Sequence, residues 1–186
     1  MSGKPARLSR PWGWHPLSDT WARRVVADAG VTSGDLVLDV GAGTGALTRP
    51  LLAAGARVVS VELHPGRYAT LRTLAESQPR LTVVRADAAD LRLPRRPFRV
   101  VANPPFAVSS ALLGRLLAPG SRLVAADLVL QRQAARRWAA GAAPGATRWR
   151  RTFSLELGRA LPRSAFHPPP RVDAVVLRVR RRRDVR

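Results

Sequence analysis

Residues 36–45 read L-V-L-D-V-G-A-G-T-G, and this stretch decides the fold. Its first five positions form a short apolar run of the kind that becomes a buried strand. Glycines then occupy every second position, at Gly41, Gly43 and Gly45. Glycine is needed where the chain turns sharply and where a ligand must approach the backbone closely. The stretch therefore predicts a strand, a tight loop suited to a ligand, and then a helix.

The same alternation of apolar runs and helical stretches continues outward along the chain. Runs rich in Val and Leu cover residues 36–40, 57–61, 81–85, 98–102 and 123–130, and two last strands are expected at 153–157 and 172–179. Helical stretches are expected after Ser18, with Trp21, Val25, Val26 and Ala29 on one face, and at 46–54, 68–75 and 111–117. This pattern predicts an α/β, Rossmann-like fold: a mostly parallel sheet with helices on both faces.

The glycine spacing distinguishes between nucleotide cofactors. A dinucleotide fingerprint, G-x-G-x-x-G, would need glycine at position 46, where this chain has Ala46. The lysine of a phosphate-binding P-loop is also missing. Instead, Asp39 precedes three alternating glycines. This pattern resembles the S-adenosylmethionine (SAM) loop of class I methyltransferases, a resemblance that implies SAM as cofactor.

Carboxylates follow the next two strands of the predicted sheet. Ligands of such sheets bind at the carboxyl ends of the strands. Glu62, at the end of the second strand, is positioned to accept hydrogen bonds from ribose hydroxyls. Asp87, after the third strand, is expected to bind the adenine amine of the cofactor, with Asp90 as the alternative. Together with Gly41, Gly43 and Gly45, these residues predict a cofactor site at one edge of the sheet.

The fourth strand runs into N-P-P-F at residues 103–106, which suggests a catalytic loop. An exocyclic base amine is a poor nucleophile because its lone pair is delocalised into the ring. The side-chain oxygen of Asn103 and the carbonyl of Pro104 are expected to accept its two protons, which localises and orients that lone pair. Phe106 is expected to stack on a flipped or unpaired base. The alternative is a rigid turn that only caps the strand.

These motifs resemble the rRNA adenine dimethyltransferase family. A further stretch near the end, F-H-P-P-P-R-V-D-A-V-V-L at residues 166–177, resembles the family's F-x-P-x-P-x-V-x-S-x-V motif, and the likeness covers residues 15–178. The segments R-P-F-R-V-V-A-N-P-P and A-A-D-L-V-L-Q-R are similar to the actinobacterial erythromycin-resistance (Erm) type. That resemblance implies methylation of the 6-amino group of one adenine in 23S rRNA, at the peptidyl-transferase region, and resistance to macrolides, lincosamides and streptogramins. It also places Asn103 beside the cofactor.

Two departures from the family pattern bear on the site. The family's N-terminal Q-N-F-L motif is W-H-P-L here, so the resemblance assigns cofactor contacts to His15 and Leu17. The family's helical C-terminal domain is expected to be absent. We therefore expect three parts: a basic arm at 1–16, a SAM-dependent methyltransferase domain at 17–179, and an arginine-rich tail at 180–186.

The chain is strongly basic. Its 186 residues include 32 Lys plus Arg against 12 Asp plus Glu, a net charge of +20. Such an excess opposes compaction unless a polyanion binds, and the usual polyanion is nucleic acid. We expect RNA to contact the arm, a mobile basic helix and loop at 132–151, and the tail. The alternatives are biased codon usage for the composition and a solvated end for the tail.

Several classes of protein are excluded or disfavoured. With no cysteine there is no disulfide scaffold, thiolate zinc site or cysteine nucleophile. No apolar run reaches membrane-spanning length, and the N-terminus lacks the apolar segment of a secretory signal. We expect a cytoplasmic monomer with 23S rRNA as partner, and no metal, membrane or protein partner. The alternative functions are methylation of adenine in small-subunit rRNA or DNA, and a non-catalytic RNA-binding role on the same fold.

Overall fold

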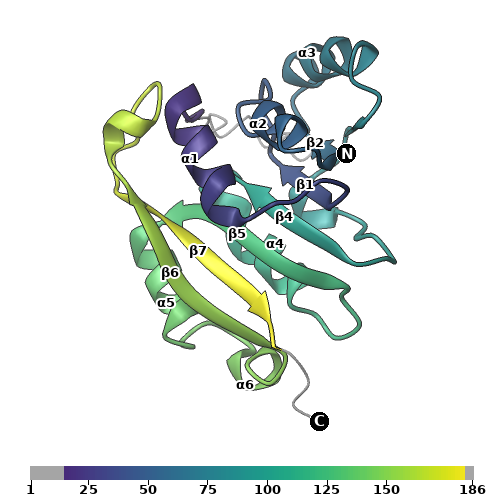
Figure 1. Ribbon diagram of the computed structural model, residues 1–186. Helices are drawn as coiled ribbons and strands as arrows, with labels where there is room; N and C mark the ends of the chain where they lie inside the picture. The colour runs from purple at the N-terminus through teal and green to yellow at the C-terminus, as the bar shows by residue number, and fades with distance from the viewer. Residues whose placement is uncertain (1–14, 183–186) are drawn as a thin grey trace, which may run out of the picture.

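The computed structural model describes residues 15–182, so nearly all of the arm expected at 1–16 and the end of the tail lie outside the described residues. One seven-stranded sheet has the order β3-β2-β1-β4-β5-β7-β6 (Figure 1). The strands are β1 (Leu36–Val40), β2 (Arg57–Val61), β3 (Leu81–Val84), β4 (Phe98–Ala102), β5 (Leu123–Gln131), β6 (Phe153–Leu161) and β7 (Ala174–Arg181). The first five strands are parallel, while β7 is antiparallel to both of its neighbours. The predicted α/β fold with a mostly parallel sheet is confirmed.

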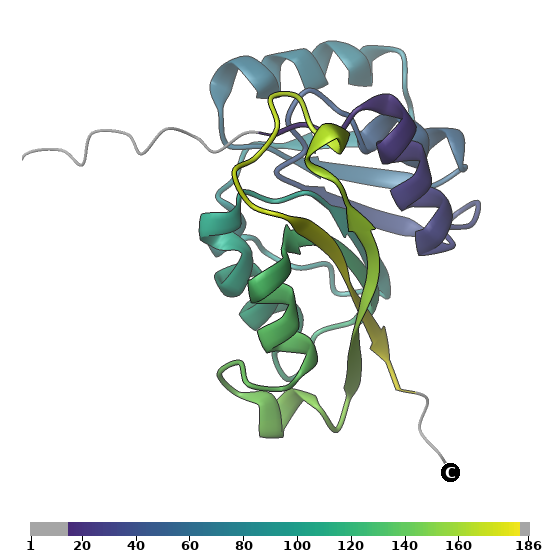
Figure 2. The same ribbon diagram turned by 90° about the vertical axis from the view of Figure 1, so that its left-hand side faces the viewer.

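Helices cover both faces of the sheet (Figure 2). The α-helices are α1 (Asp19–Ala29), α2 (Thr48–Ala53), α3 (Pro65–Glu76), α4 (Ser109–Leu116), α5 (Arg132–Ala139) and α6 (Ala146–Trp149). Three short 3₁₀ turns are η1 (Ala88–Asp90), η2 (Phe106–Val108) and η3 (Arg163–Ala165). The first three helices pack on one face, and the last three on the other. No helix in residues 15–182 is long and apolar enough to cross a membrane.

The central strands are apolar at nearly every position because both of their faces are covered. In β1, Leu38 belongs to the core beneath α4 and α5, while its neighbour Val37 belongs to the core beneath α1 and α2. Val100 and Val101 of β4 divide in the same way. Successive strand residues point to opposite faces, so a strand buried on both faces has no polar alternation. The carboxyl ends of these strands are therefore left as the open edge for a site.

Residues 132–151 differ from the mobile basic segment that we expected. Two tryptophans anchor the segment: Trp138 of α5 and Trp149 of α6 are both 5% exposed, with ring centroids 5.9 Å apart. Ala135 is fully buried beside them. In the sequence, arginines lie on both sides of these apolar residues. The composition of the segment therefore gives no sign that the two tryptophans are buried. Most of the arginines of the segment are exposed, among them Arg136, Arg137, Arg148, Arg150 and Arg151.

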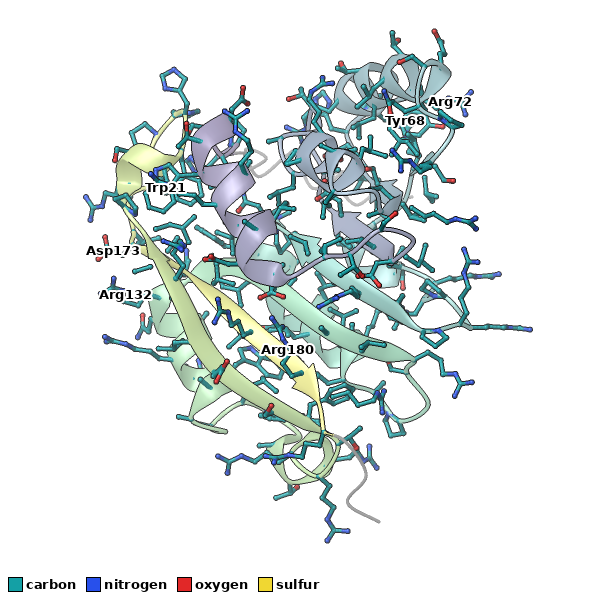
Figure 3. The ribbon with its side chains drawn as sticks, in the orientation of Figure 1. Trp21, Tyr68, Arg72, Arg132, Asp173 and Arg180 are labelled. Atoms are coloured by element: carbon teal, nitrogen blue, oxygen red, sulfur yellow. The ribbon has the colours of Figure 1, made fainter. Side chains whose placement is uncertain are left out.

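The boundary expected at residue 180 also differs, because β7 continues to Arg181. Arg180 pairs with the buried Asp127 of β5 at 2.9 Å, and Figure 3 shows Arg180 on the sheet face below α1. Arg181 stacks on the ring of Phe153, 4.7 Å from its centroid. The first arginines of the expected tail are thus part of the sheet, and residues 183–186 lie outside the described residues.

Candidate active site

The glycine loop joins β1 to α2 through three left-handed residues. Gly41, Gly43 and Gly45 have φ values of 74°, 60° and 95°. Gly41 also lies against the N-P-P-F loop: a Cβ built on it would stand 2.9 Å from Cδ of Pro105 and 3.3 Å from Cα of Pro104. Any side chain at this position would therefore displace the adjoining loop. The third glycine has another role, since a Cβ on Gly45 would meet Leu71 of α3 at 3.3 Å.

Glu62 fixes the glycine loop and faces the cleft. Its side chain is 4% exposed and accepts hydrogen bonds from the backbone N–H groups of Gly43 and His64, each at 2.8 Å. Arg67 of α3 lies 3.4 Å from one of its oxygens. An ionised carboxylate has about four acceptor positions, and these three donors occupy three of them. About one position is left, which is enough to accept from one hydroxyl of a ribose.

Asp39 is the second buried carboxylate at the cleft. It is 1% exposed, accepts a 2.7 Å hydrogen bond from Thr48 Oγ1, and has the Glu62 carboxylate nearby. The Thr48 hydroxyl also lies 2.8 Å from Ser60 Oγ. Burial raises the pKa of Asp39 to about 7, and the charge of Glu62 acts in the same direction against the opposing effect of Thr48. Asp39 is thus poised to change charge near neutral pH.

Asn103 follows β4 at the centre of the cleft, and its amide orientation is fixed. Its Nδ2 donates a 2.9 Å hydrogen bond to the backbone carbonyl of His15. A carbonyl oxygen only accepts, so the amide nitrogen must face it, and Oδ1 faces the other way. The carbonyl of Pro105 accepts from Val108 N at 3.0 Å, whereas within residues 15–182 the carbonyl of Pro104 has no donor. Two acceptors, Asn103 Oδ1 and the Pro104 carbonyl, are therefore available.

Residues 15–18 are held beside this loop by the F-H-P-P-P segment. Leu17 forms an isolated bridge with Phe166, and the backbone N–H of His167 donates to the Pro16 carbonyl at 3.0 Å. The ring nitrogen Nδ1 of His15 lies 2.9 Å from the carbonyl of Pro168. Two segments separated by 153 positions thus pair at the site and present the carbonyl that orients Asn103.

A single cleft collects most of the predicted site residues. His15, Leu17, Gly41, Glu62, Asn103, Pro104 and Phe106 all line it. Gly43 reaches it only through its bond to Glu62, and Gly45 packs against α3. Besides Asp39 of the glycine motif, seven lining residues were not predicted as site residues: Pro16, Ala42, Thr44, Ala46, Leu47, Arg67 and Pro105. Pro16, Thr44 and Pro105 lie inside or beside the quoted motifs, while Arg67 carries no sequence signal of its own.

Asp87 is not among the lining residues. Its exposed side chain caps η1 by accepting from the backbone N–H of Ala89 at 2.8 Å. The alternative, Asp90, forms a 2.8 Å ion pair with Arg115 of α4. The assignment of the cofactor's adenine amine to Asp87 therefore stays a prediction.

The parallel sheet, the alternating glycine loop and the buried glutamate after β2 are features of the class I SAM-dependent methyltransferase fold. Within that class, the ribosomal RNA adenine dimethylase family matches residues 17–185. The chain belongs to this family, as the motifs predicted.

Relatives of known sequence fall under two descriptions. A ribosomal RNA small subunit methyltransferase A of Leifsonia xyli is 40% identical over 173 residues, covering 83% of this chain and 59% of that protein. An rRNA adenine N-6-methyltransferase of Corynebacterium diphtheriae is 36% identical over 151 residues, covering 81% of this chain and 59% of that protein. The chain thus spans about six-tenths of the length of these relatives.

Solved structures agree with the fold. The 23S rRNA methyltransferase ErmE superposes with a TM-score of 0.78 at 31% identity, covering 90% of this chain and 70% of that one. A dimethyladenosine transferase of Plasmodium falciparum superposes with a TM-score of 0.77 at 25% identity, covering 90% of this chain and 64% of that one.

Proposed function

We propose that the protein methylates the 6-amino group of one adenine in 23S rRNA and thereby confers resistance to macrolides, lincosamides and streptogramins. The observation that carries the proposal is the fixed amide of Asn103, which leaves Oδ1 and the Pro104 carbonyl as a pair of acceptors for one amine. The likeness to ErmE and the Erm-type segments favour 23S rRNA as the substrate. We expect a monomer that works in the cytoplasm, where this RNA is found.

The residues of the cleft divide into cofactor and substrate roles. Glu62 is proposed to bind the ribose of SAM, with His15, Leu17 and the glycine loop enclosing the rest of the cofactor. SAM supplies an electrophilic methyl group: the adenine N6 forms the new N–C bond, sulfur keeps the electron pair of the broken C–S bond, and one N6 proton leaves to solvent. Asn103 and Pro104 hold the amine, and Phe106 stacks on the base.

This arrangement requires no general base before attack. Both acceptors are fixed in place by the fold, so their orientation is not lost to solvent reorganisation when charge develops on the amine. Prolines on either side of the Pro104 carbonyl restrict the backbone that carries it. Orientation and electrostatics are therefore the proposed source of rate enhancement.

A second candidate is adenine methylation in small-subunit rRNA. The 40% identity to the Leifsonia xyli small subunit methyltransferase A favours it. The test is incubation of the purified protein with labelled SAM and separate 23S and 16S rRNA transcripts, followed by primer extension to locate the modified base. A stop in 23S rRNA only, with raised macrolide tolerance in a susceptible host, is the expected result. A stop in 16S rRNA only would overturn the proposal in favour of the second candidate.

A further inference from the structure

Within residues 15–182, the net positive charge lies in one lateral half of the structure. Residues 15–90, which form β1, β2 and β3, contain eight arginines and eight acidic residues. Residues 91–182, which form β4 to β7, contain nineteen arginines and three acidic residues. In the sheet order the boundary falls between β1 and β4, so the two sets of strands lie side by side. Residues 15–18, α1 and η1 contact the other half across this boundary. Biased codon usage would raise the arginine content of both halves, so it does not explain why one half is neutral and the other is basic.

The basic half has few acidic groups of its own, although three of its arginines, Arg99, Arg115 and Arg159, pair with Asp35, Asp90 and Asp28 of the other half. Asp127 is 2% exposed and paired with Arg180. Asp173, seen beside α5 in Figure 3, lies 3.5 Å from Arg163. In this half, only Glu156 of β6 is an exposed carboxylate without an ion pair among the described residues. A surface of this kind attracts polyanions and repels other basic molecules.

Two adjoining grooves concentrate these arginines at the amino ends of β4 and β5. They share the loop at residues 118–122, and no acidic residue lines either one within the described part of the chain. Arg92, Arg95, Arg122 and Arg148 line them, are exposed, and form no ion pair within residues 15–182. The side chain of Val124, 44% exposed, adds an apolar contact in the same place.

These grooves lie far from the catalytic loop. Ala102, just before Asn103, pairs with Leu128, which is six residues along β5 from Arg122. At about 3.3 Å per residue, the separation along the strand is about 20 Å. One nucleotide does not bridge this distance. Phosphates bound in the grooves must therefore belong to a part of the RNA several nucleotides away from the target adenine.

We infer that the grooves at residues 91–97 and 117–122 form a second RNA-binding surface, which holds the phosphate backbone of a folded RNA while the cleft holds the adenine. The inference rests on the proposed function. It adds that the RNA substrate must extend from the cleft, near the carboxyl end of β5, to the grooves at its amino end. Arginines of this surface contact phosphates, so they contribute affinity and position rather than base selection.

The test compares two triple variants that remove equal charge. One is Arg95→Gln, Arg122→Gln and Arg148→Gln in the grooves. The control is Arg23→Gln, Arg49→Gln and Arg72→Gln, three exposed residues of the neutral half; Figure 3 shows Arg72 on α3. Filter binding of 23S and 16S rRNA transcripts is measured against salt concentration, with SAM affinity by calorimetry as the check on folding.

We expect the groove variant to bind rRNA at least tenfold more weakly. Its log–log salt slope should be shallower by about 2, because each phosphate that an arginine no longer neutralises removes about 0.7 from the slope. The control should stay within twofold of the unaltered protein, and SAM affinity should hold in both.

Equal weakening of rRNA binding in the two triple variants would overturn the inference. The outcome is separate from that of the proposed function, because binding is measured without methyl transfer. If no RNA is methylated, the proposed function fails, while the binding comparison still decides whether the grooves hold RNA.

Discussion

At the scale of single residues, we propose that the amide of Asn103 has two functions. Its nitrogen donates to the His15 carbonyl, and its oxygen is proposed to accept from the substrate amine. We expect Asn103→Ala to lower methyl transfer on the order of a hundredfold, as the loss of one preorganised polar contact does in other enzymes. Calorimetry should find SAM affinity nearly unchanged, because Glu62 and the glycine loop stay in place. Near-normal turnover by a folded Asn103→Ala protein would refute the assigned mechanism.

Asp39 gives a residue-scale prediction that depends on pH. Its pKa is near 3.8 in an unfolded chain, but burial raises it to about 7 in the folded protein. Between these values the native state holds a proton that the unfolded state has lost, so this residue's stabilising contribution falls as pH rises from about 4 to about 7. The slope is at most about 1.4 kcal/mol per pH unit.

The measurement is urea unfolding of the unaltered protein and Asp39→Asn at pH 5, 6 and 7. Asparagine keeps an acceptor for the Thr48 hydroxyl but does not titrate in this range. Other titrating groups are common to both proteins and cancel in the difference. The stability of the unaltered protein relative to Asp39→Asn should decline with pH; a constant difference would mean that Asp39 is not protonated in the native state.

At the scale of elements, two glycines provide a matched pair. Gly41→Ala places a Cβ 2.9 Å from Pro105 in a left-handed backbone, so it should destabilise the fold by more than about 1 kcal/mol and reduce methyl transfer. Gly114→Ala, inside α4 with open space around it, should stabilise by about 0.5–1 kcal/mol and leave activity unchanged. Thermal unfolding and the primer-extension assay measure both effects. If Gly41→Ala changed neither stability nor methyl transfer, the close contact between the glycine loop and the N-P-P-F loop would not be required.

The elements also show how far sequence reasoning reaches. The bounds of β1, β2 and β4 follow directly from apolar runs, because strands buried on both faces carry no other pattern. The edge strand β6 extends to Leu161 rather than 157; its register shifts between Leu157 and Ala160, and polar and apolar residues do not alternate regularly through that shift. The contact between Asn103 and His15 joins residues 88 apart, and periodicity carries no information on such a pair. The position of Asp87 after β3 suggests a cofactor contact, but its side chain turns back to cap η1.

At the scale of the whole molecule, the composition predicts that a polyanion binds, but it does not show which surface binds it. The net charge of +20 is a property of the chain, whereas the neutral and basic halves exist only once the strand order is known. The order places the glycine loop, which is proposed to bind the cofactor, at the junction between the halves, with Glu62 on the neutral side and Asn103 on the basic side. The proposed cofactor and the proposed RNA therefore approach from different sides of one cleft.

The crowding of arginines should also lower stability when no RNA is bound. Like charges repel over about 30 Å at about 10 mM salt but over only about 10 Å at about 100 mM, so added NaCl should raise the melting temperature of the free protein. At about 10 mM NaCl, the groove variant with Arg95, Arg122 and Arg148 changed to Gln should melt about 2–4 °C higher than the unaltered protein, which corresponds to about 1 kcal/mol.

The variant with Arg23, Arg49 and Arg72 changed to Gln removes the same charge from a half where acidic residues balance it, so its shift should be smaller. At about 300 mM NaCl the three proteins should converge, because screening then acts within a few ångströms. Equal shifts in the two variants at low salt would mean that repulsion is spread over the whole surface rather than concentrated in the basic half.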